Sequence, residues 1–174
     1  IVHLIEQKLA KPEEILAVTF TEKAAYEMEE RVDKLLDFGY LDLWISTFHA
    51  FCERVLRENA LDIGLSPDFK ILDGTAGWLL ARQNLEKFDL KYYQALGNPT
   101  KFISALLTFF SRAQDEAISP SELLKFAKKQ KQTDLLEVAR AFQTYQDLKL
   151  KHSLLDFGDL INYTINLFRA RPAI

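Results

Sequence analysis

Apolar runs and helix-like patterns alternate over the first sixty residues of the chain. Residues 15–20 form an apolar run rich in strand formers, which predicts a parallel strand buried on both faces. Thr21 follows as the expected N-cap of a helix whose apolar residues recur every three or four positions up to Leu36. The same order returns at residues 43–46, with Thr47 as the expected cap of a second helix. Two such units in succession predict an α/β sheet.

Beyond Gly64 the pattern becomes helical, apart from a short apolar run at residues 69–72. Helix starts are predicted near Thr75, after residues 99–100, at residue 120, near Asp134 and after Asp156. Residues 119–122, Ser-Pro-Ser-Glu, supply the N-cap, the proline and the acid of a capping box. This part of the chain is therefore expected to be a helical insertion in the α/β unit.

Apolar spacing also predicts which faces of these helices pack into a core. In the helix after residues 99–100, the expected core residues are Phe102, Leu106, Phe109 and Ala113. In the last helix they are Leu160, Ile161, Ile165 and Phe168.

Composition limits the class of protein. With 174 residues, 48% of them apolar, the chain is long enough for one domain, or one domain with a modest insertion. Its single cysteine, Cys52, excludes an intrachain disulfide and a cysteine-based zinc site and indicates a reducing compartment, so we expect a cytoplasmic protein. No apolar run approaches the roughly 20 residues of a membrane helix. The chain opens without Met inside a helix-like pattern, which suggests an internal piece of a longer protein.

Each strand-to-helix junction carries hydroxyl and aromatic side chains. The first offers Thr19, Phe20, Thr21 and Lys23, and the second offers Thr47, Phe48 and His49. Ligands of open α/β sheets gather at the carboxyl ends of strands, and the unpaired amides of a helix start favour phosphate. A phenylalanine there can stack on a nucleobase. The formal charge of −3 means that any nucleic-acid contact must be local. Each residue also has a purely structural interpretation, as a cap or as core.

Asp156 and Asp159 form a further candidate site, because paired acids can bind a metal or perform acid–base catalysis. The structural interpretation is favoured, with Asp156 as an N-cap and Asp159 as an acid at the third helical position. The sequence contains no G-x-x-x-x-G-K-[ST] phosphate loop, so no ATP site is expected within it.

Three segments together resemble the UvrD/Rep/PcrA family of superfamily 1 DNA helicases. They are residues 15–32, 45–57 and 154–161, which are similar to the family's motif Ia, its motif Ib and the segment before the Walker B strand. The resemblance implies part of a RecA-like P-loop NTPase parallel sheet with an inserted, mostly α-helical subdomain. Residues 1–62 would belong to motor subdomain 1A, residues 63–152 to the insertion, subdomain 1B, and residues 153–174 to the return to 1A. The Walker A loop would lie before Ile1 and the Walker B acids after Ile174.

The family's activity follows as an expectation. The parent protein would be an ATP-dependent 3'-to-5' DNA helicase or translocase acting in repair or recombination, with ATP and Mg²⁺ as cofactors. This chain would contribute contacts with single-stranded DNA through Thr19, Phe20, Thr21, Lys23, Thr47, Phe48 and His49. It would hold no catalytic residue, metal or cofactor and would not hydrolyse ATP alone. Repair or recombination proteins are candidate partners, and exposed sheet edges predict self-association.

Three alternatives stay open. A UvrD/Rep-like repair helicase is the default parent, and a RecB/AddA-like helicase-nuclease is the alternative, since those proteins share the motifs. The chain can instead be a helical protein-interaction module that binds neither DNA nor nucleotide. The least supported alternative is a self-contained hydrolase that uses Asp156, Asp159 and His49.

Overall fold

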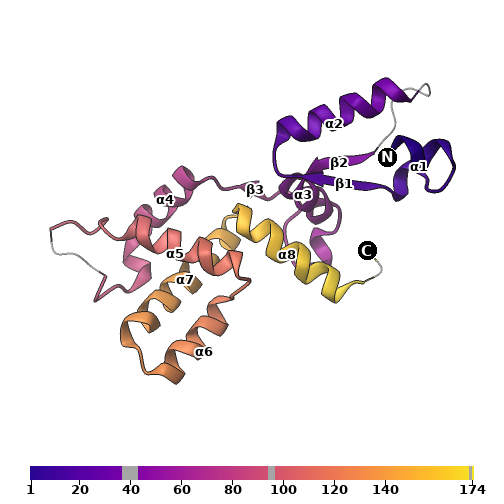
Figure 1. Cartoon of the computed structure of the whole chain (residues 1–174). Coiled ribbons are helices and arrows are strands. Elements are labelled where there is room, and N and C mark those ends of the chain that lie inside the picture. The colour runs from indigo at the N-terminus through magenta and orange to yellow at the C-terminus, as the bar shows by residue number, and fades with distance from the viewer. Residues whose placement is uncertain (37–42, 94–96, 173) are drawn as a thin grey trace. The chain divides into compact units, whose positions relative to one another are not determined.

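The computed structural model describes residues 1–36, 43–93, 97–172 and 174, which form two compact units (Figure 1). The first unit is Ile1–Glu58 and the second is Asn59–Ile174. The division therefore falls between Glu58 and Asn59, slightly before the predicted boundary at residue 62, and residues 153–174 cluster with the helical unit. Assignment of these regions to helicase subdomains stays a prediction.

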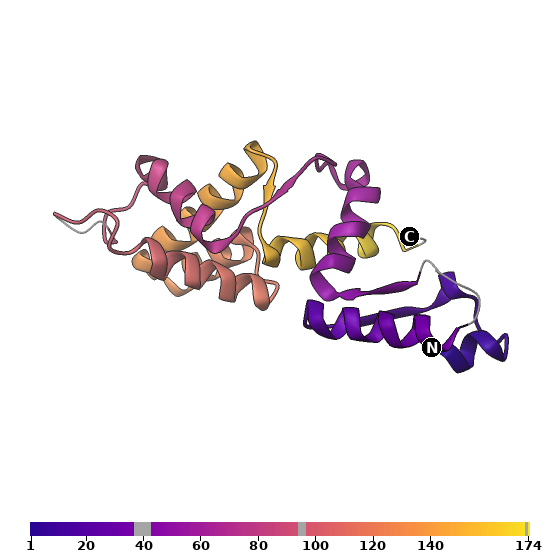
Figure 2. The ribbon, with the colours of Figure 1, turned by 90° about the horizontal axis from the view of Figure 1, so that it is seen from above.

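Two parallel strands form the sheet of the first unit. Strand β1 (Leu16–Thr19) pairs in register with β2 (Trp44–Thr47), so that Thr19 lies opposite Thr47. Helix α2 (Glu22–Leu35) packs along both strands, as Figures 1 and 2 show, and α3 (Phe48–Glu58) follows β2 directly. Short helices α1 (Val2–Glu6) and η1 (Pro12–Glu14) precede the sheet. The predicted pair of strand-turn-helix units is confirmed.

One expectation for β1 was wrong. The strand is not buried on both faces: Leu16 is 50% exposed, and the other three residues are half-buried. Within the described residues β1 has a single partner strand, so part of its surface has no neighbour to cover it. The buried side chains of this unit come mainly from the helices, namely Ala25 and Val32 of α2 and Cys52, Val55 and Leu56 of α3.

The second unit consists mostly of helices. Its main helices are α4 (Gly74–Gln83), α5 (Ile103–Asp115), α6 (Pro120–Gln130), α7 (Thr133–Lys151) and α8 (Phe157–Ala170). Its short elements are η2 (Ala60–Ile63), β3 (Lys70–Ile71), η3 (Leu85–Phe88) and β4 (Leu154–Leu155). Strand β3 pairs in parallel with β4, which the sequence had not predicted as a strand. In the described part of the chain, no helix is both long and apolar enough to span a membrane.

Side-chain caps fix the starts of α4 and α6. The predicted capping box of α6 is confirmed: Ser119 caps the helix, and the Glu122 carboxylate accepts from the Ser119 backbone N–H at 2.9 Å. The helix predicted near Thr75 begins at Gly74, where the Asp73 carboxylate accepts from the Ala76 N–H at 2.7 Å. Asp73, which the sequence pattern did not predict as a cap, is therefore the N-cap of α4.

Two of the predicted helix faces were partly wrong. In α5, Phe110 is buried and Phe109 is 38% exposed. In α8, the buried positions are Asp159, Leu160, Thr164 and Leu167, whereas Ile165 and Phe168 are exposed. Both helices carry apolar residues on neighbouring faces, so apolar spacing alone does not determine which face meets the core.

The core of the second unit forms around α5 and α7. The rings of Phe110 and Phe142 stack with centroids 4.9 Å apart and an interplanar angle of 14°. Gly77 of α4 approaches the same region so closely that an added Cβ would lie 2.7 Å from the Tyr145 hydroxyl oxygen. Helix–helix packing in this unit therefore depends on the absence of a side chain at Gly77.

A carboxylate of α7 also holds the segment that follows η3. The oxygens of Glu137 accept three successive backbone N–H groups, those of Lys91, Tyr92 and Tyr93, at 2.9 to 3.0 Å. Burial alone would raise the pKa of Glu137, but these three hydrogen bonds and the Lys91 charge lower it. Glu137 thus stabilises this segment in its ionised form.

Candidate functional site

The two strand-to-helix junctions lie at one edge of the β1–β2 sheet. Because the strands are parallel and Thr19 pairs with Thr47, the residues that follow them, Phe20 and Phe48, emerge side by side. Their ring centroids are 5.1 Å apart, and the ring planes are tilted by 45°. The predicted shared edge is confirmed.

These two aromatic side chains are open to solvent to different degrees. Phe20 is 87% exposed and Phe48 is 38% exposed. Neither ring therefore serves mainly to fill a core. Exposed, adjacent aromatic rings at the carboxyl ends of parallel strands provide a surface on which a planar group can stack.

Thr21 and Thr47 both cap helices. The Thr21 hydroxyl oxygen accepts from the Ala24 N–H at 3.2 Å, and that of Thr47 accepts from the Ala50 N–H at 3.2 Å. Both predicted caps are confirmed. Thr47 is only 4% exposed, and its hydroxyl donates to Glu22 Oε1 at 3.0 Å. The Thr47 hydroxyl proton is therefore already donated to a carboxylate of the protein.

The remaining predicted residues surround this edge. Thr19 is half-buried at the end of β1, and His49 is exposed in the first turn of α3. Lys23 is 87% exposed, with its ammonium 3.9 Å from Glu27. The structure therefore places all seven predicted residues at or next to the two junctions.

Sequence reasoning had not predicted the bond between Glu22 and Thr47. An acid at the first position of a helix is common, because negative charge there suits the helix dipole. Only the parallel register of β1 and β2 brings Thr47 to the start of α2, where Glu22 lies.

A second polar cluster lies in the helical unit, around the start of α8. Asp156 and Asp159 form the predicted capping box: Asp156 Oδ1 accepts from the Asp159 N–H at 2.9 Å, and Asp159 Oδ2 accepts from the Asp156 N–H at 3.0 Å. Lys149, which is fully buried, donates to both carboxylates, with 2.6 Å between its ammonium and Asp159. The Gln114 amide nitrogen also donates to both. Sequence analysis had overlooked Lys149 and Gln114.

The electrostatics of this cluster support a structural role. Burial raises the pKa of the Asp159 carboxyl; the Lys149 ammonium opposes that shift, and the Asp156 carboxylate adds to it. Two carboxylates share one ammonium, and protein donors engage both of them. Among the described residues, no group of three or more His, Cys, Asp or Glu side chains is arranged to hold a metal ion. These contacts favour a structural role over acid–base catalysis. The cluster in which Lys149 and Gln114 hold the Asp156 and Asp159 carboxylates is called the clasp below.

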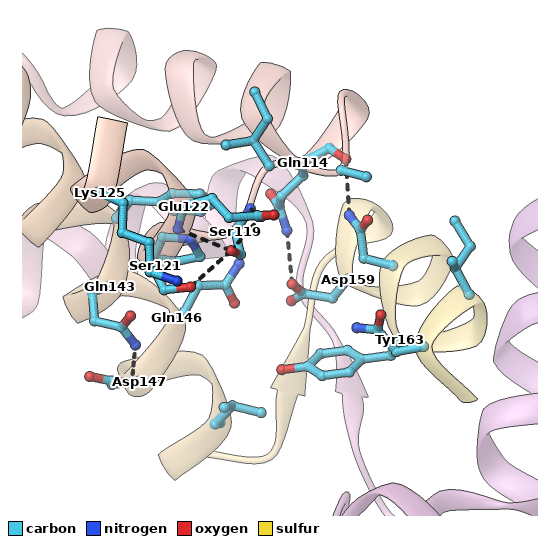
Figure 3. Close-up of a pocket in the computed structure, with 18 of the residues that line it drawn as sticks. Gln114, Ser119, Ser121, Glu122, Lys125, Gln143, Gln146, Asp147, Asp159 and Tyr163 are labelled. Carbon is cyan, nitrogen blue, oxygen red and sulfur yellow. Dashed lines mark hydrogen bonds between the residues drawn. The ribbon is translucent and has the colours of Figure 1, made fainter. Parts of the chain in front are cut away.

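A cavity of about 600 Å³ lies beside this clasp, between α6, α7, α8 and the end of α5 (Figure 3). Gln114, Gln143, Gln146 and Tyr163 are among the side chains that line it. Burial, together with the charges of Asp159, Asp156 and Asp147, raises the pKa of Tyr163 to about 12.

Comparison with known proteins shows the family. A family model described as the UvrD/REP helicase N-terminal domain matches residues 1–174, so the chain belongs to this family. The resemblance noted in the sequence is confirmed.

The relatives to which the chain is similar include several proteins named ATP-dependent DNA helicase PcrA. The chain is 38% identical over 175 residues to that of Bacillus subtilis (strain 168), a match covering 100% of this chain and 22% of the helicase. It is 37% identical over 178 residues to the helicase of Staphylococcus aureus (strain Mu50 / ATCC 700699), a match covering 100% of this chain and 23% of that helicase. It is 37% identical over 175 residues to the helicase of Leuconostoc citreum, a match covering 100% of this chain and 22% of that helicase. The chain thus spans less than a quarter of the length of these relatives.

Proposed function

We propose that the whole protein is an ATP-dependent 3'-to-5' DNA helicase or translocase, and that this chain contributes contacts with single-stranded DNA. The observation that carries the proposal is the exposed pair Phe20 and Phe48 at one sheet edge. Base stacking on such rings contributes roughly 1–3 kcal/mol per base in proteins that bind single strands. The family and the names of the PcrA relatives support the helicase activity.

In this proposal the sheet edge holds the strand through stacking and backbone contacts. The proposed contact residues are Thr19, Phe20, Thr21, Lys23, Thr47, Phe48 and His49. The amides that begin α2 and α3 favour phosphate, and Lys23 adds positive charge.

The motor itself would require more of the protein. We propose that residues 1–62 and 153–174 belong to a RecA-like motor subdomain and that residues 63–152 are its helical insertion. ATP and Mg²⁺ would bind to the complete motor, and the chain alone would not hydrolyse ATP, since its sequence has no phosphate loop. A cytoplasmic role in repair or recombination, with proteins of those processes as partners, belongs to the same proposal. A RecB/AddA-like parent stays the alternative.

The direct test of the proposal is binding of a fluorescent single-stranded oligodeoxynucleotide, followed by anisotropy. Phe20→Ala should weaken binding roughly 5- to 150-fold, the range that corresponds to losing one stacked base. Phe126→Ala is the matched control, because Phe126 is a 52% exposed phenylalanine on α6 in the helical unit. Equal binding by the wild-type chain and Phe20→Ala would contradict the proposed site and favour the protein-interaction alternative.

A further inference from the structure

Glu22 joins the two junctions of the proposed strand site. It is the first residue of α2, and its Oε1 accepts the Thr47 hydroxyl proton at 3.0 Å. The Thr47 oxygen also accepts from the Ala50 N–H. A hydroxyl has one proton to donate, so Thr47 cannot donate to a phosphate while it donates to Glu22.

The negative charge of Glu22 also opposes the binding of a phosphate at this edge. Its carboxylate stands at a helix start, the position whose amides and dipole would otherwise favour a phosphate. Glu22 is exposed, and it lies two residues after Phe20. Negative charge therefore stands beside the aromatic pair on which the strand is proposed to stack.

We propose that Glu22 competes with the phosphate backbone at this edge and lowers the affinity of the site for single-stranded DNA. The inference rests on the proposed function and deepens it. A phosphate that approaches the start of α2 meets the Glu22 charge, and the buried Thr47 hydroxyl keeps its proton on the Glu22 carboxylate. The aromatic pair thus supplies attraction, and Glu22 supplies repulsion that lowers the affinity.

Glu22→Gln tests this inference in the full 174-residue chain. The substitution removes the charge and keeps a side-chain oxygen able to accept from Thr47. We expect single-stranded oligodeoxynucleotides to bind roughly 1.5- to fivefold more tightly in about 0.1 M salt, as for removal of one exposed charge interaction. The gain should shrink as salt screens the charge.

Glu30→Gln is the matched control. Glu30 lies on the same helix, makes an exposed pair with Lys34 at 2.6 Å, and its backbone is roughly 12 Å further along the helix axis. The control makes the same change in net charge at a distance that exceeds the Debye length, which is about 10 Å at 0.1 M salt. It should leave binding unchanged.

The outcomes separate this inference from the proposed function. Salt-dependent tightening in Glu22→Gln alone supports the inference. If Phe20→Ala weakens binding while Glu22→Gln matches Glu30→Gln or binds more weakly, the strand site stands and the role of Glu22 is overturned. If Phe20→Ala binds as the wild type does, the proposed function fails, and the inference fails with it.

Discussion

The ring centroids of Phe20 and Phe48 lie 5.1 Å apart, although the two residues belong to different strand-to-helix units. The parallel, in-register pairing of β1 and β2 produces this contact. If a strand of DNA stacks on both rings, the two side chains must act together.

This contact predicts coupling between the two phenylalanines. Phe48→Ala should weaken binding of single-stranded DNA less than Phe20→Ala, because Phe48 offers less than half the exposed fraction. The double variant should lose less free energy of binding than the sum of the two single losses. Anisotropy titrations of the four proteins measure the coupling, and strictly additive losses would show that the rings act independently.

The buried ammonium of Lys149 predicts a stability effect in the helical unit. Lys149→Met should lower the free energy of unfolding by about 3–5 kcal/mol, because it leaves the Asp156 and Asp159 carboxylates without their cation. Lys151→Met, an exposed position on the same helix, should change stability little. Urea unfolding followed by circular dichroism gives both values. If Lys149→Met left the free energy of unfolding unchanged, the clasp would contribute nothing to the stability of the fold.

Glu137 predicts a pH-dependent contribution to stability. Its pKa in the folded protein lies below the ordinary value of 4.5, so its stabilising effect is fully present above that pH. The effect is lost as pH falls through the folded-state pKa. Glu137→Gln should therefore be less stable than the wild type at neutral pH, by about 1–3 kcal/mol, with the difference narrowing in acid. Thermal unfolding across the acid range tests this, and a constant difference would contradict it.

Two glycines of α4 predict opposite responses to alanine. Alanine normally stabilises a helix by roughly 0.5–1 kcal/mol relative to glycine. Gly74→Ala should show a smaller gain of the same sign, since Gly74 is the first residue of α4 and an added Cβ meets nothing within 4 Å. Gly77→Ala should instead lose about 1–3 kcal/mol, because its Cβ would lie 2.7 Å from the Tyr145 hydroxyl oxygen. Equal melting temperatures for the two variants would show that Tyr145 moves aside freely.

Local chemistry explains what the sequence predicted correctly. The caps at Thr21, Ser119 and Asp156 depend on residues within one helical turn, and all three are observed. The strand-turn-helix order at both junctions is equally local, and motif resemblance identified the family. The edge shared by Phe20 and Phe48 followed once the strands were taken as parallel.

Tertiary contacts explain what the sequence did not show. Lys149 lies among ordinary helix residues, and only the fold brings its side chain to the two aspartates of α8. The bond from Thr47 to Glu22 likewise depends on strand register. The face of α8 that carries Leu160 and Leu167 was chosen by packing, since Ile165 and Phe168 form an equally apolar alternative.

Photo-crosslinking of an iodouracil-substituted single-stranded oligodeoxynucleotide, followed by peptide mapping, tests the central claim most directly. The proposed strand site predicts crosslinks within residues 19–23 and 47–49, with Phe20 prominent, and their loss in Phe20→Ala. Crosslinks confined to residues 103–170 of the helical unit would contradict it, because the DNA would then contact a surface other than the edge formed by Phe20 and Phe48.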